Sequence, residues 1–84
     1  MPNVMRVGPY RFHFWSRENN EPPHIHVTRD RREAKFWIDP LVELDRNRGF
    51  KSHEINRIRR LVEQRREFML EAWHDHFRTR HHNA

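Results

Sequence analysis

The sequence contains no cysteine and only two glycines in 84 residues. The lack of cysteine excludes disulfides and thiolate metal sites, and Gly8 and Gly49 are too far apart to form a glycine-rich phosphate loop. No apolar run approaches the length that crosses a bilayer. The N-terminus lacks the basic segment, apolar run and small-residue cleavage site of a signal peptide. We therefore expect a cytoplasmic protein with no membrane contact.

The charge balance is basic, with 17 Lys and Arg against 12 Asp and Glu and a net charge of +5. Two of the 17 are lysine, Lys35 and Lys51, and the others are arginine. The planar guanidinium of arginine makes bidentate contacts with phosphate and carboxylate groups. This composition permits binding of nucleic acid or of an acidic protein, without choosing between them.

The first half of the chain alternates apolar and polar residues with the period of β-strands. Turn residues separate the alternating runs, which is typical of antiparallel hairpins. The expected strands are 4–7, 10–16, 24–30, 33–38 and a short edge strand at 41–44. We expect the residues at 17–23 to form a polar loop. The sequence thus predicts an antiparallel meander of three to five strands within residues 3–45.

After Phe50 the apolar period changes to that of a helix. One apolar stripe carries Ile55, Ile58, Val62, Met69, Trp73 and Phe77. Ser52 is a residue type that caps helix N-termini. Arg65 and Arg66 interrupt the stripe, which indicates a bend or side chains that extend to its edge. We expect one long helix over about 52–79 and a polar tail at 80–84, and hence a single α+β domain over 1–84 in which the helix covers the sheet.

Strand parity assigns the two faces of the sheet. The face toward the helix carries the apolar residues Tyr10, Phe12, Phe14, Ile25, Val27, Phe36 and Ile38. The opposite face carries Arg11, His13, Trp15, His24, His26, Lys35 and Trp37. We expect this second face to be exposed to solvent and to carry the function.

The motif PPHIHV, residues 22–27, places two histidines two positions apart. On a strand such residues share a face at a separation of about 6–7 Å. His24 and His26 could therefore converge on a divalent transition metal ion, with His13 or Glu33 as the third ligand. A strand that merely alternates polar and apolar residues produces the same motif. The number of available metal ligands decides between a metal site and simple alternation.

Two kinds of binding remain open for the second face. Trp15 and Trp37, with Arg11 and Lys35, have the composition of a platform on which the bases of single-stranded nucleic acid stack. Exposed tryptophan and arginine are equally typical of the residues that dominate protein–protein interfaces.

Catalysis also remains open. A ribonuclease-like reaction needs a general acid and base, and cations that stabilise the phosphate. His13, His24, His26 and Glu33 are the candidate acid and base, and the cations of the same face lie beside them. The sequence contains no recognisable Ser-His-Asp arrangement, so it leaves undecided whether the protein is an enzyme.

Four segments carry a resemblance to a known family: MPNVMRVGPYRFHFWS, NNEPPHIHV, EAKFWIDPLVEL and GFKSHEINRIRRLVEQRREFMLEAWHDHF. They cover nearly the whole chain and resemble the small prokaryotic family catalogued as domain of unknown function 4160. EPPHIHV together with AKFW is the most specific combination. Members of that family are commonly encoded beside another small protein in a layout that suggests a toxin–antitoxin pair. The resemblance implies a cytoplasmic, two-component function, and it assigns no catalytic residues to this chain because none are established for the family.

We therefore expect a bacterial toxin–antitoxin-type component that binds a small cognate protein and nucleic acid, with RNA as the target if it is the toxin. The alternative is a metal-binding or regulatory adaptor or inhibitor without catalysis, for example one encoded by a mobile element. Should the histidines be structural, the next candidate surface is formed by Arg57, Arg60 and the histidines of the tail.

Overall fold

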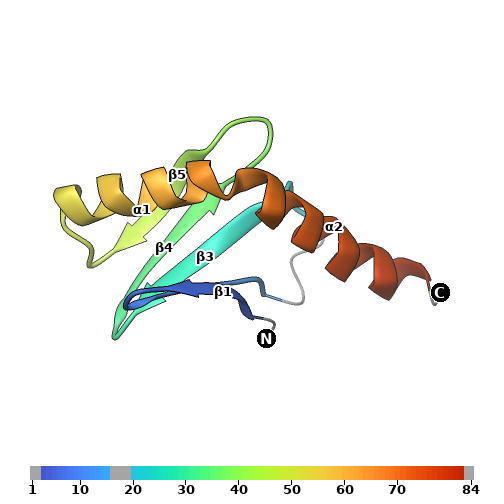
Figure 1. Cartoon of the computed structure of the whole chain (residues 1–84), viewed down its shortest axis with the longest axis horizontal. Coiled ribbons are helices and arrows are strands. Elements are labelled where there is room, and N and C mark those ends of the chain that lie inside the picture. Colours follow the sequence, from blue (N-terminus) through green and yellow to red (C-terminus); the bar gives the residue numbers. More distant parts are fainter. Residues whose placement is uncertain (1–2, 16–19, 83–84) are drawn as a thin grey trace.

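Five strands in chain order form one antiparallel sheet, and two helices follow it (Figure 1). The computed structural model describes residues 3–15 and 20–82, with side chains up to Phe77. The elements are β1 (Asn3–Val7), β2 (Tyr10–His13), β3 (His24–Arg29), β4 (Arg32–Trp37), β5 (Glu43–Arg48), α1 (Ser52–Gln64) and α2 (Arg66–His82). The α+β meander predicted from the sequence is confirmed. Strand β2 ends at His13, before the predicted end at Ser16, and residues 16–19, which include the first three residues of the predicted loop, lie outside the described residues.

Two-residue turns close the hairpins β1–β2 and β3–β4, since Val7 pairs with Tyr10 and Arg29 pairs with Arg32. The first turn needs a positive φ at Gly8, which is 56°. The second has φ 55° at Asp30, a residue type that tolerates the left-handed region better than most. Turns this short fix the register of the strands, and the register decides which side chains share a face.

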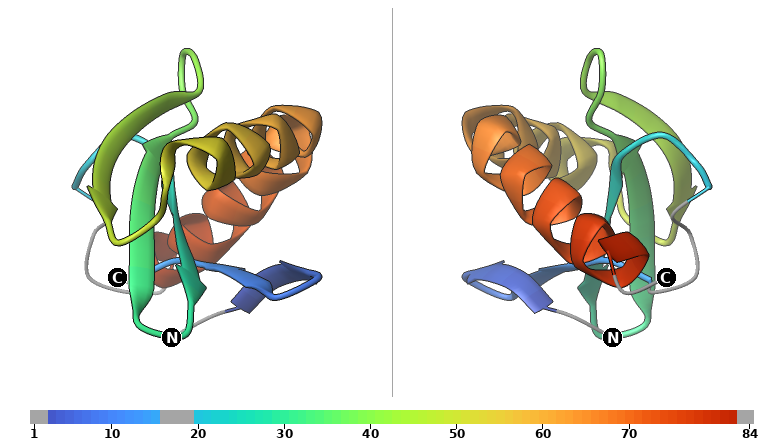
Figure 2. Two further views of the ribbon diagram at one scale, coloured as in Figure 1. Left: turned by 90° about the vertical axis from the view of Figure 1, so that its left-hand side faces the viewer. Right: turned by 90° about the vertical axis from the view of Figure 1, so that its right-hand side faces the viewer.

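Both helices lie on one side of the sheet, as the two views of Figure 2 show. The core between the layers holds every apolar residue that parity assigned to the inner face, together with the apolar stripe of the helices. The strand and helix periodicities predict five buried aromatic residues, and all five are buried: Phe12, Phe14, Phe36, Trp73 and Phe77. Each large aromatic side chain removed from water stabilises the fold by roughly 1.5–3 kcal/mol, which matters in a chain of this size.

The C-terminal segment is two adjoining helices, and the prediction of one long helix is wrong. Arg65 leaves the helical conformation at φ −111° and ψ 17°. The next residue explains the break, because the Arg66 side chain donates to the carbonyls of Ile38 (2.7 Å) and Pro40 (2.9 Å). These bonds fix the start of α2 against the loop after β4. From there α2 continues past the end of the sheet at which β3 begins (Figure 1).

The helix α1 begins at Ser52, but its N-cap lies one residue earlier than the sequence predicts. Lys51, and not Ser52, is the N-cap, in an extended conformation and without a side-chain capping bond. The turn before it is closed by Asn47, whose side chain accepts from the N–H of Phe50 (3.1 Å) and donates to its carbonyl (2.9 Å). Within the described ranges 3–15 and 20–82, no helix is both long and apolar enough to cross a membrane.

Candidate functional site

The three histidines of strands β2 and β3 lie together on the sheet face away from the helices. His13 is the cross-strand partner of His26, and His26 is the partner of Lys35 on β4. The rings of His13 and His26 stack at 5.8 Å and 16°, and the ring of His24 meets that of His26 edge-on at 5.1 Å. The shared face predicted by parity is therefore confirmed.

The predicted exposure of this face is wrong for its polar centre. His13, His24, His26 and Lys35 are 1%, 0%, 2% and 6% exposed. The histidine rings cover one another, and the Trp15 ring lies edge-on to His13 at 5.4 Å and at a steep angle to His26 at 5.6 Å. The segment 20–23 also passes on this side of the sheet (Figure 2). The centre of the face is a second small core made of polar side chains.

His24 lies where the two cores meet. Strand β2 ends at His13, so the Trp73 ring of α2 reaches the start of β3 and lies 4.8 Å from the His24 ring. His24 Nδ1 lies 2.9 Å from the carbonyl oxygen of Pro22. A carbonyl only accepts, so Nδ1 carries a proton and donates to it. These contacts give His24 a structural role in fixing where β3 begins.

Lys35 is surrounded by its own counter-charges. Its Nζ donates to Glu21 Oε1 at 2.6 Å, lies 3.7 Å from Asp45 Oδ2, and lies 4.5 Å from the centre of the Trp37 ring. A buried ammonium needs such partners, because desolvation alone would cost several kcal/mol, on the order of the penalties known for unpaired ions. Lys35 is therefore not the solvent-facing cation that the sequence predicts.

His13 is buried without a hydrogen-bond partner for either ring nitrogen among the described residues. Burial, and then the nearby charges of His26 and Arg11, lower the pKa of His13 from 6.5 to about 4, while Glu33 acts in the opposite direction. His13 is therefore neutral at physiological pH and needs no counter-charge.

The last strand carries two arginines that the sequence analysis missed. Phe36 pairs with Leu44 but Lys35 pairs with Arg46, so Asp45 is an extra residue in β5. Such a bulge reverses the parity of everything after it. Leu44 consequently packs against the core, whereas Arg46 and Arg48 turn to the opposite face.

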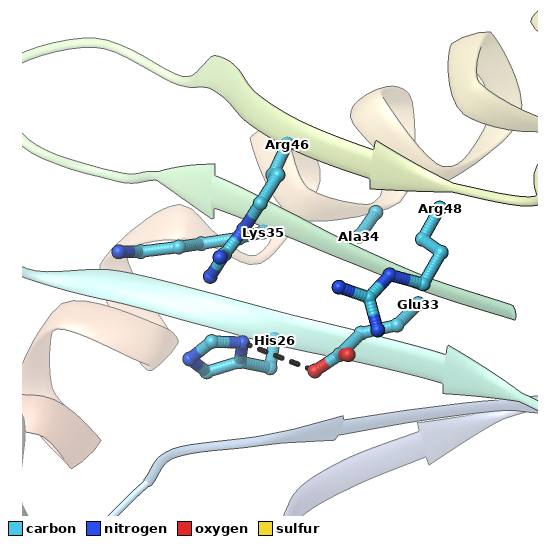
Figure 3. A pocket seen from close by; sticks show the side chains of 6 residues that line it. All are labelled: His26, Glu33, Ala34, Lys35, Arg46 and Arg48. Carbon is cyan, nitrogen blue, oxygen red and sulfur yellow. Dashed lines mark ion pairs between the residues drawn. The ribbon is translucent and has the colours of Figure 1, made fainter.

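Arg46 and Arg48 complete a pocket of about 60 Å³ on that face (Figure 3). Its walls are formed by His26, Glu33, Ala34, Lys35, Arg46 and Arg48. His26 Nδ1 lies 3.6 Å from Glu33 Oε2. In the part of the chain that the structure describes, neither arginine has an ion-pair partner within 4 Å, so both guanidinium groups can bind an anion.

The four candidate catalytic residues therefore form one cluster in which all three histidines are buried. His26 and Glu33 line the pocket, whereas His13 and His24 do not. A histidine beside a carboxylate is the arrangement of an oriented general base. Arginines next to it provide charge-assisted, bidentate contacts to a phosphate.

The other predicted binding residues differ in exposure. Arg11 is exposed, Trp15 is 41% exposed and Trp37 is half-buried. No group of three or more His, Asp or Glu side chains in residues 3–15 and 20–77 is arranged to hold a metal ion. These residues therefore provide no third ligand for a metal ion bound by His24 and His26.

A family profile described as a domain of unknown function (DUF4160) matches residues 10–74. The chain belongs to the DUF4160 family. The DUF4160 match begins at the first residue of β2 and extends into α2, so it contains the histidine cluster and the pocket. Searches of curated proteins and of solved structures find no match. The resemblance noted in the sequence is confirmed.

Proposed function

We propose that this DUF4160 protein is a toxin–antitoxin-type component that binds single-stranded RNA at the pocket of His26, Glu33, Arg46 and Arg48. The observation that carries the proposal is the pair of arginines on β5, which have no ion-pair partner in the described residues and flank a histidine–carboxylate pair. Guanidinium groups in this position fit a phosphodiester, which presents two acceptor oxygens to a planar donor.

Trp15 supports the choice of a single-stranded ligand. Its ring is 41% exposed and lies 5.6 Å from that of His26, so it borders the histidine cluster. Stacking of a base on an aromatic ring contributes about 1–3 kcal/mol per base and is available only when the base is unpaired. A strand with a phosphate at Arg46 and Arg48 and a base on Trp15 would cross the face beside His26.

In the toxin form of the proposal, RNA is cleaved. His26, oriented by Glu33, removes the proton of the ribose 2′-hydroxyl, and the 2′-oxygen attacks the adjacent phosphorus. The bond from phosphorus to the 5′-oxygen breaks, which leaves a 2′,3′-cyclic phosphate on one fragment, and a water molecule protonates the departing 5′-oxygen. Arg46 and Arg48 stabilise the negative charge that develops on the phosphate. His13 and His24 act through the position of His26, because their rings pack against the His26 ring and neither lines the pocket. In the adaptor form the same surface binds RNA without cleaving it.

The second part of the proposal is a small cognate protein. Strand β5 is an edge strand that pairs only with β4 in the described sheet, and most of its residues are exposed. An exposed edge offers unpaired backbone groups to a strand of a partner. An acidic partner added there would cover Arg46 and Arg48 and block the RNA surface, which is the relation expected of an antitoxin and a toxin.

Fluorescence anisotropy with labelled single-stranded RNA tests the binding claim. We expect affinity that falls as salt rises, because bound phosphates release counterions. Arg46→Gln/Arg48→Gln should bind roughly tenfold or more weakly, since hydrogen bonds to charged groups contribute about 1.5–3 kcal/mol each. The matched control is Arg60→Gln/Arg65→Gln, which removes two exposed arginines from the helical segment. Equal weakening by both pairs, or no binding at all, would refute the proposal.

Gel analysis of the same RNA separates the two forms. Cleavage that is lost in His26→Ala, and absent for DNA of the same sequence, identifies the toxin. Binding without cleavage identifies the adaptor. Induced expression with and without the neighbouring gene then tests the pair: growth arrest that the neighbour relieves supports a toxin with its antitoxin.

A further inference from the structure

A second pocket is lined by residues of the β3–β4 hairpin and of the start of α1. These two segments lie at the same end of the molecule (Figure 1). Its volume is about 310 Å³. It is lined by the side chains of Arg29, Arg32, Lys51, His53, Glu54 and Arg57. None of these residues lines the His26 pocket, so the two sites are separate.

The charge of this lining is strongly positive. Four cations, Arg29, Arg32, Lys51 and Arg57, surround the single carboxylate of Glu54, which leaves a net charge of +3 with His53 neutral. Arg29 and Arg32 both contact the Glu54 carboxylate, so their charges lie within roughly one Debye length of each other, about 8 Å at physiological ionic strength, and salt screens their repulsion incompletely. An anion in the pocket would relieve that repulsion.

Glu54 holds two of the arginines in place. Arg29 Nη1 donates to Glu54 Oε2 at 2.8 Å, and Arg32 Nη1 lies 3.5 Å from Oε1. The hydroxyl of Tyr10 donates to Oε2 at 3.1 Å. Burial works against ionisation of Glu54, but the hydrogen bonds from Tyr10 and Arg29 and the charges of Arg32 and Arg29 outweigh it, so its pKa lies below the usual value.

This arrangement preorganises donors for a ligand. A guanidinium has five N–H groups, so Arg29 and Arg32 retain donors beyond those directed at Glu54. Lys51 and Arg57 are exposed, and neither has an ion-pair partner among the described residues. Donors whose positions are already fixed lose less entropy when they bind.

The turn before α1 brings Lys51 to this pocket. Gly49 has φ 102°, a conformation that other residues rarely adopt. A Cβ at Gly49 would lie 3.1 Å from Cγ of Arg32, so the backbone passes directly over the arginine side chain. The glycine therefore allows the close approach that places Lys51 beside Arg32.

We propose that this pocket binds a phosphate group bearing two or more negative charges, such as a terminal phosphate of RNA or the diphosphate of a free nucleotide. The inference does not depend on the proposed function, because it concerns different residues and a different ligand group. A net charge of +3 matches a multiply charged phosphate better than the single charge of a backbone phosphodiester.

Isothermal titration with sodium pyrophosphate tests the site. We expect saturable binding of one equivalent, weakened about tenfold or more in Lys51→Gln/Arg57→Gln, since the variant removes two charged hydrogen-bond donors. Both residues are exposed, and unchanged thermal melting checks that the variant is folded. The matched control, Arg60→Gln/Arg65→Gln, removes the same charge elsewhere and should bind pyrophosphate nearly as well as the wild type.

Equal weakening by both pairs of substitutions would show that net charge alone attracts the anion and would overturn the proposal, as would the absence of saturable binding. Competition then identifies the source of the phosphate. Displacement of pyrophosphate by a 5′-phosphorylated RNA, and not by its 5′-hydroxyl counterpart, points to a nucleic-acid end. Displacement by a nucleoside diphosphate, with no preference between the two RNAs, points to a free nucleotide. If neither displaces it, the assignment to a biological phosphate fails.

Discussion

His13 makes the stability of this protein sensitive to mild acid. The folded protein holds His13 neutral, with a pKa lowered to about 4 by burial and by the charges of His26 and Arg11, against 6.5 in an exposed histidine. Below pH 6.5 the unfolded chain therefore binds a proton at His13 that the folded protein does not. The free energy of unfolding falls as the pH falls from 6.5 toward 4, and this contribution is constant below that range.

The size of the effect follows from the two pKa values. The full difference between 6.5 and about 4 corresponds to roughly 3 kcal/mol. At pH 5 the unfolded chain is almost fully protonated at His13 and the folded protein is not, so about 2 kcal/mol is already lost. That is a large share of the stability of a domain of this length.

Urea unfolding followed by tryptophan fluorescence at pH 7, 6 and 5 measures this loss. His13→Leu removes the titrating ring at a position where neither ring nitrogen has a hydrogen-bond partner among the described residues. We expect the variant to lose about 2 kcal/mol less than the wild type between pH 7 and pH 5. His74→Leu, which replaces an exposed histidine of α2, is the control and should keep the wild-type pH dependence. Identical pH dependence in the wild type and His13→Leu would refute the role of His13.

Three further predictions concern other parts of the molecule. Phe36→Ala should lower the free energy of unfolding by roughly 3–5 kcal/mol in urea titrations, whereas Phe68→Ala, at a side chain that is 51% exposed, should cost far less. Glu54→Gln should lower the melting temperature at pH 7. The difference from the wild type should shrink as the pH falls through the folded pKa of Glu54, because a carboxyl with a lowered pKa stabilises only above that pKa. Lys35→Met should weaken RNA binding less than Arg46→Gln in anisotropy titrations, because the charge of Lys35 is already paired with Glu21.

Local periodicity predicted the parts of the fold that depend on neighbouring residues. Alternation with period two identified the core face and placed His13, His24 and His26 on the other face, because antiparallel pairing keeps side chains of like parity together. Alternation says nothing about what lies above a face. The burial of the histidines arises from Trp15, from the segment 20–23 and from Trp73, which are distant in sequence or outside a strand.

Two other features depend on tertiary contacts that a sequence does not display. The helical segment contains no glycine or proline, yet it breaks at Arg65 because Arg66 bonds to backbone carbonyls after β4. The bulge at Asp45 reverses the parity of β5, so Arg46 and Arg48 leave the face on which Leu44 lies. Because of this one extra residue in β5, alternation along the sequence did not assign Arg46 and Arg48, the central cations of the proposed RNA site, to the face away from the helices.

The most direct test of the proposed RNA site is an NMR titration of isotope-labelled protein with a short single-stranded RNA. We expect chemical-shift changes at the guanidinium groups of Arg46 and Arg48 and at the indole N–H of Trp15, all on the face away from the helices. Arg60 of α1, which lines neither pocket, should not shift. Shifts confined to the helices, or spread evenly over every arginine of the protein, would contradict an RNA site beside His26.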